Sequence, residues 1–94
     1  MTNLELALKD PTTVKDDTTF SEATYHIIKD IEKAEGTAKL LLSAKLEELK
    51  CHYYNYMASS LGHRWKAIAD TYLDDAHYAF NRLISIYKKL PEEE

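Results

Sequence analysis

Cysteine is nearly absent from this sequence: Cys51 is the one example in 94 residues. One cysteine cannot build a disulfide framework within a chain or a cysteine-based zinc module. Glycine and proline are scarce as well, with two of each, whereas a β-sandwich or barrel needs turn residues roughly every ten positions. No apolar run reaches the length of a membrane span, and residues 1–15 lack the pattern of a secretory signal. We therefore expect a small, cytoplasmic, all-α protein that does not insert into membranes.

Strong charge of one sign is also missing. The formal net charge is −4, with acidic residues concentrated at the two ends and a small excess of basic residues over 37–90. Such a weak excess argues against duplex DNA as a partner, because DNA-binding proteins present a strongly basic face. It leaves a small anionic ligand open.

The first part of the chain has the signals of a short helix and a linker. Residues 3–9 can form two helical turns behind Thr2, with Asp10-Pro11 ending them, and residues 12–19 are polar. Thr19 to Glu22 has the spacing of a capping box, so a longer helix is expected to begin there. This pattern predicts three parts: a polar segment over 1–19, a helical domain over 20–90 and an acidic tail over 91–94.

A heptad pattern dominates the second half of the chain. Apolar residues recur in steps of four and three over the last helix, and a matching series precedes the Ser59–His63 connection. A short connection between two such series predicts an antiparallel helical hairpin. The series on the last helix is Trp65, Ala69, Tyr72, Ala76, Ala79, Leu83, Ile86 and Leu90; the preceding series is Leu42, Leu46, Leu49, Tyr53, Tyr56 and Ser60.

The apolar phase of the preceding helix continues back through Gly36, which favours one long helix, although a break that lets a third helix fold back is the alternative. The last helix would cover a long helix only back to about residue 35. Apolar residues upstream would then need a second subunit. The last helix also has an apolar flank that a two-helix hairpin alone cannot bury, formed by Ile68, Leu73, Phe80, Ile84 and Tyr87. We therefore predict a homo-oligomer in which the interface includes Ile27, Ile28 and Ile31.

Few residues in the sequence point to a metal site or a catalytic site. Glu48, His52, Asp74 and His77 have the residue types of a ferritin-like metal bundle, but on two paired helices they point in different directions, so a metal site is an alternative and no cofactor is expected. Cys51 and His52 are adjacent and diverge by about 100°, which prevents a nucleophile–base pair. With no glycine-rich phosphate loop either, we expect a protein that is not an enzyme.

Aromatic and basic residues gather around the predicted hairpin tip. They can form a plug that closes the hairpin or a surface that binds a partner or an anionic ligand, since a phenol offers an apolar face and a polar tip. The candidates for this surface are Tyr53, Tyr56, His63, Arg64, Trp65 and Lys66.

The last helix also resembles a known family. Its pattern over 64–84 consists of Arg64, Ala69, Thr71, Leu73, Asp74, Asp75, Ala76, Asn81 and Ile84. This pattern is similar to that of the phage-encoded cyclic-oligonucleotide sponges, which antagonise bacterial cyclic-nucleotide immune signalling, except that the family has Glu in place of both Asp. The resemblance covers about 21 of 94 residues. It implies a non-enzymatic oligomer that sequesters anionic ligands between subunits in the host cytoplasm.

The residue patterns together favour an accessory or inhibitory interaction protein that binds copies of itself and another protein. The alternatives are a sponge for cyclic di- or trinucleotides and a carboxylate/histidine metal bundle.

Overall fold

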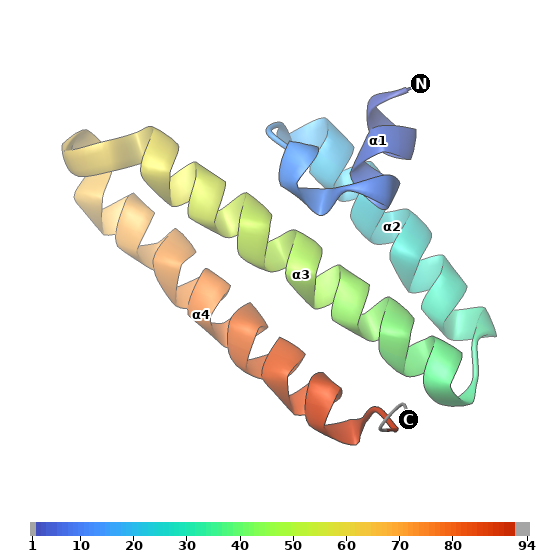
Figure 1. Cartoon of the computed structure of the whole chain (residues 1–94). Helices are drawn as coiled ribbons and strands as arrows, with labels where there is room; N and C mark the ends of the chain where they lie inside the picture. The colour runs from blue at the N-terminus through green and yellow to red at the C-terminus, as the bar shows by residue number, and fades with distance from the viewer. Residues whose placement is uncertain (1, 92–94) are drawn as a thin grey trace.

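The computed structural model describes residues 2–91 and contains helices with no β-strand in that range. The longest two, α3 and α4, run antiparallel and form the predicted hairpin (Figure 1). The all-α prediction is therefore confirmed. In chain order the elements are α1 (Asn3–Lys9), the 3-10 turn η1 (Pro11–Thr13), α2 (Asp17–Lys33), α3 (Gly36–Leu61), the 3-10 turn η2 (Gly62–Trp65) and α4 (Lys66–Lys89).

The three long helices lie side by side with α3 in the middle (Figure 1). Helix α3 packs against α2 on one side and α4 on the other, and within residues 2–91 α2 and α4 make no contact with each other. The molecule measures 46 × 31 × 23 Å, and its middle dimension is about that of three helices abreast. This arrangement is an open layer rather than a closed three-helix bundle, so much of α4 faces outward.

The main core lies between α3 and the N-terminal elements. Leu46, Leu49 and Tyr53 of α3 pack there, so these three do not face α4 as the sequence pattern suggested. A different set of α3 residues faces α4. It includes Glu47, which forms an ion pair with Arg82, and Tyr54, whose ring lies beside that of Tyr72. The buried members of the core are Ala7, Val14, Ala23, Ile27, Leu46, Leu49 and Tyr53.

On α4 the predicted heptad series does face α3. Ala69, Ala76, Ala79 and Leu83 are buried, and the small alanine side chains allow the two helix backbones to approach closely. Trp65 is the exception, because it lies in the turn η2 and is 52% exposed.

The N-terminal segment is part of the fold and not a peripheral linker. The Thr2 hydroxyl accepts a hydrogen bond from the Glu5 backbone N–H at 3.1 Å, which confirms the predicted cap of α1. Ala7 and Val14 then enter the core. The start of α2 differs from the prediction: Asp16, and not Thr19, caps it, with the Asp16 carboxylate accepting from the Thr19 N–H at 2.9 Å.

Gly36 breaks the helix, so the prediction of one long helix through it is wrong and the fold-back alternative is confirmed. Helix α2 ends at Lys33, the next two residues are extended, and Gly36 adopts a φ of 63° at the start of α3. That left-handed conformation is favourable for glycine and costly for other residues. The chain therefore reverses here, and α2 lies back along α3.

This reversal also removes the predicted subunit interface. Ile27 is 2% exposed in the chain's own core, and Ile31 packs against that core. Only Ile28, at 40% exposure, keeps much of its surface. The acidic residues 92–94 of the predicted tail lie outside the described residues.

Candidate functional site

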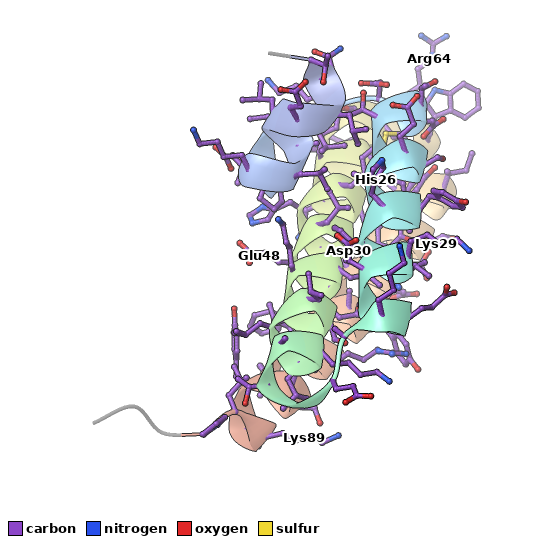
Figure 2. The ribbon with its side chains drawn as sticks, turned by 90° about the vertical axis from the view of Figure 1, so that its right-hand side faces the viewer. His26, Lys29, Asp30, Glu48, Arg64 and Lys89 are labelled. Atoms are coloured by element: carbon purple, nitrogen blue, oxygen red, sulfur yellow. The ribbon has the colours of Figure 1, made fainter. Side chains whose placement is uncertain are left out.

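The hairpin tip has four exposed polar and aromatic residues, three on the turn η2 and one at the start of α4. His63, Arg64, Trp65 and Lys66 are all exposed. The Arg64 guanidinium carbon lies 5.9 Å from the centre of the Trp65 ring, within the range of a cation–π contact. Figure 2 shows Arg64 at this extremity, with Lys89 at the other end of the molecule. These four predicted residues are brought together on one accessible surface.

Tyr53 does not belong to this tip surface. It is 2% exposed, its ring stacks on Phe20 of α2 at 4.1 Å between centroids, and its hydroxyl donates a hydrogen bond to the Asp17 carboxylate. Tyr53 therefore joins α3 to the start of α2, and an aromatic plug with Trp65 is not formed. Tyr56 is exposed but separate from the Tyr53 stack.

The structure does not assemble the alternative metal site. Glu48, His52, Asp74 and His77 were its candidates, and within residues 2–91 no three histidine, cysteine or acidic side chains cluster in a way that could hold an ion. Glu48 projects from α3 away from α2 (Figure 2).

Cys51 is poorly suited to nucleophilic chemistry. The thiol is half-buried, and burial raises its pKa above the ordinary value of 9.0, which outweighs the opposing hydrogen bond with Asn55. A thiol with a raised pKa carries little thiolate at neutral pH, and the thiolate is the reactive form.

A row of large apolar side chains remains exposed on α4. We call it the α4 stripe: Leu73, Phe80, Ile84 and Tyr87, which are 39%, 48%, 37% and 51% exposed. At about 100° per residue these four positions lie on one flank of the buried alanine face. Because α2 does not reach α4, no other described element covers the stripe.

Comparison with known proteins adds no relative. No family model, curated protein or solved structure matches this chain. In residues 2–91 no helix has the length and apolar character needed to cross a membrane.

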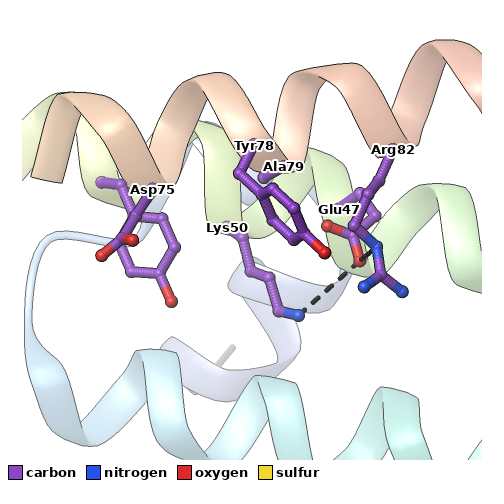
Figure 3. A pocket seen from close by; sticks show the side chains of 7 residues that line it. Glu47, Lys50, Asp75, Tyr78, Ala79 and Arg82 are labelled. Carbon is purple, nitrogen blue, oxygen red and sulfur yellow. Dashed lines mark ion pairs between the residues drawn. The ribbon is translucent and has the colours of Figure 1, made fainter.

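On the other flank of the alanine face, a pocket of about 180 Å³ lies between α3 and α4 (Figure 3). Its floor holds Glu47, which is 3% exposed and forms ion pairs with Lys50 at 3.6 Å and Arg82 at 3.2 Å. Small-molecule pockets usually span about 300–1,000 Å³, so this pocket can hold only a small chemical group. The lining residues are Glu47, Lys50, Tyr54, Asp75, Tyr78, Ala79 and Arg82.

The sequence pattern did not single out this pocket as a site. Glu47 lies in phase with the buried Ala44 and Ala58 and with Tyr54, so these positions form a second heptad series on α3. An acidic residue inside a buried series is a detectable signal, because a buried carboxylate requires a cationic partner.

Proposed function

We propose that this protein is a non-enzymatic helical interaction protein that associates with copies of itself and acts as an accessory or inhibitory protein by binding a partner. The observation that carries the proposal is the α4 stripe. Large apolar side chains exposed along one flank of a helix are typical of interaction sites in soluble proteins.

The charges on α4 favour a second copy of the chain as the occupant of the stripe. Of the charged residues on α4 beyond Lys66, Asp70 in the first half of the helix and Lys88 in the second half lie nearest to the stripe. Two α4 helices packed antiparallel through the stripe would therefore place Asp70 of each copy beside the basic end of the other.

A pairing centred on residue 80 brings stripe residues of the two copies together. Leu73 of one copy would meet Tyr87 of the second, the two Phe80 side chains would meet each other, and Asp70 would lie near Lys88. Full burial of a large apolar side chain is worth about 1.5–3 kcal/mol. Side chains that are already partly buried gain less free energy. A two-fold pairing, however, buries four such side chains from each copy.

Such a pairing leaves the hairpin tip free for another partner. The tip lies at one end of the molecule, and its exposed Trp65 and Arg64 are the residue types most often found at interaction hot spots. Sedimentation equilibrium tests the self-association: the proposal requires a mass that rises with concentration above that of the monomer. A mass fixed at the monomer value would contradict it.

A cyclic-nucleotide sponge is the second candidate, favoured by the exposure of residues that carry the last-helix resemblance. Arg64, Thr71, Asp74 and Asn81 are all exposed on η2 and α4, so they are accessible to a ligand held between subunits. A ligand that binds the folded state raises the melting temperature. Cyclic di- or trinucleotides should therefore raise it for the native chain and less for Arg64→Gln; no shift with either class would exclude this candidate.

A further inference from the structure

The pocket between α3 and α4 contains an unusual buried carboxylate. Glu47 is 3% exposed, and one of its oxygens, Oε1, pairs with both Lys50 Nζ and Arg82 Nε. A single buried acid that gathers two cations leaves this trio with one positive charge in excess. A structural ion pair needs only one cation to compensate the acid.

Arg82 uses only part of its guanidinium in this contact. The ion pair to Glu47 is made through Nε, and an arginine carries further N–H donors on its two terminal nitrogens. In Figure 3 those terminal nitrogens lie on the side of the guanidinium away from the α4 ribbon. Lys50 and Arg82 both line the pocket, so two cationic groups border the same space.

Two tyrosines, Tyr54 and Tyr78, also line the pocket. The Arg82 guanidinium carbon lies 5.8 Å from the centre of the Tyr78 ring, which helps to fix its position. Burial, together with the charges of Asp75 and Glu47, raises the pKa of Tyr54 above its ordinary value of 10.0. Its hydroxyl therefore remains protonated at neutral pH and able to donate a hydrogen bond.

Asp75 limits the charge that the pocket can accept. It is exposed and lines the far end, seven residues before Arg82, which is about 10 Å along the helix. A compact group with one or two negative charges can avoid it, whereas an extended polyanion would meet it.

We propose that this pocket binds a small oxyanion, the carboxylate or phosphate group of a ligand, between Lys50 Nζ and the terminal guanidinium nitrogens of Arg82. Glu47 has the positioning role, because its carboxylate holds both cations at the pocket floor. Tyr78, whose ring lies beside the Arg82 guanidinium, borders the anion on the same side.

This inference is separate from the proposed self-association. Asp75, Tyr78 and Arg82 lie on the flank of α4 opposite to the α4 stripe, on either side of the buried alanine face. A dimer formed through the stripe would leave the pocket open. Either proposal can therefore fail while the other holds.

Nuclear magnetic resonance titration of the whole isotope-labelled chain tests the site. Inorganic phosphate and, in a separate series, acetate are added at constant ionic strength. We expect saturable shifts at Lys50, Tyr78 and Arg82 with phosphate, acetate or both. Saturation by phosphate alone identifies a phosphate site, saturation by acetate alone a carboxylate site, and saturation by both a general oxyanion site.

Variants separate a built site from surface charge. Lys50→Met and Arg82→Lys should each weaken binding about tenfold, since each removes a charged hydrogen bond to the anion. Arg82→Lys keeps a cation beside Glu47 and so preserves the fold, and Tyr78→Phe supplies a second test that leaves every ion pair intact. Lys33→Met and Lys39→Met, which remove exposed cations elsewhere, should leave the affinity within about twofold.

Two results would overturn the proposal. The first is the absence of saturable shifts in the pocket with both anions. The second is equal loss of affinity in the pocket variants and the two control variants, which would mean that the anions are attracted to surface charge in general.

Discussion

Among the charged residues of the described range 2–91, Glu47 is the one whose side chain is buried. Its side chain is almost fully buried between α3 and α4, and its two cationic partners are themselves partly exposed. A buried carboxylate depends on such partners, because burial without them costs several kcal/mol. Glu47 thus ties the fold of the hairpin to the chemistry of the pocket.

Removal of one partner should therefore destabilise the chain. Arg82→Ala is expected to lower the free energy of unfolding by about 1–3 kcal/mol, since Glu47 would keep only Lys50. Arg64→Ala, at an exposed arginine on the tip, should change it by less than about 0.5 kcal/mol. Urea denaturation measures both, and equal effects would show that the Glu47 pair is energetically unimportant.

Asp16 gives the N-terminus of α2 a dependence on pH. The backbone N–H of Thr19, assisted by the Thr19 hydroxyl, lowers the pKa of Asp16 below its ordinary value of 3.8. Because the folded-state pKa is lowered, the stabilisation is present above the unfolded-state value and is lost as pH falls below it.

Asp16→Asn tests that dependence while it keeps a side-chain oxygen able to cap the helix. We expect the native chain to be more stable than the variant at about pH 6 and the difference to vanish near pH 2. Urea midpoints at the two pH values check this. A difference that is the same at both would show that ionised Asp16 contributes nothing.

At the scale of the elements, the α4 heptad series is the feature best predicted from sequence. Its periodicity is strict, and Ala69, Ala76, Ala79 and Leu83 are buried as expected. The partner face on α3 was misassigned, because α3 is apolar on two faces and its more apolar series, with Leu46 and Leu49, belongs to the N-terminal core. Periodicity shows that a face is buried but not which neighbour covers it.

The close approach of α3 and α4 makes Ala76 sensitive to size. Ala76→Leu should overpack the interface and destabilise the chain by about 1–3 kcal/mol. Ala67 lies on the same helix and is exposed, so Ala67→Leu should change stability by less than about 0.5 kcal/mol. Thermal denaturation followed by circular dichroism compares them, and the same melting temperature for Ala76→Leu and the native chain would place Ala76 outside the interface.

The turn at Gly36 depends on its backbone conformation alone. Nothing lies within 4 Å of a Cβ built at this position, while its φ is 63°. Gly36→Ala should therefore cost about 1–2 kcal/mol from backbone strain without any clash. An unchanged urea midpoint would show that α2 folds back without the left-handed residue. From sequence the break was ambiguous, because the apolar phase of α2 and α3 happens to continue across it.

At the scale of the whole molecule, the order of the helices decides what is exposed. Since α3 occupies the middle of the layer, α4 is covered on one face only, and the α4 stripe is left outward. The sequence indicated that apolar surface would exceed what a hairpin can bury, both on the flank of the last helix and at Ile27, Ile28 and Ile31, and the predicted interface was assigned to the three isoleucines. The fold-back of α2 covers Ile27 and Ile31, so the excess that remains is the flank of α4.

The hairpin tip could be predicted from the sequence, whereas the pocket around Glu47 could not, because the pocket depends on how the helices are arranged. His63, Arg64, Trp65 and Lys66 are contiguous in sequence, so their common position at the tip follows from the hairpin alone. The pocket around Glu47 combines residues from α3 and α4 that only the true register brings together. Tyr53 was misplaced because its neighbour, Phe20, lies on a helix that was expected to extend away from it.

Self-association through the α4 stripe is the central claim, and sedimentation equilibrium of two double variants tests it most directly. Phe80→Asp with Ile84→Asp places charges on the stripe. Tyr25→Asp with Ile28→Asp changes two exposed residues of α2, which are 62% and 40% exposed. We predict that the α4 pair reduces the native assembly to monomers that remain helical by circular dichroism, and that the α2 pair leaves the assembly intact. An α4 double variant with the native mass, or dissociation by the α2 pair alone, would contradict the account.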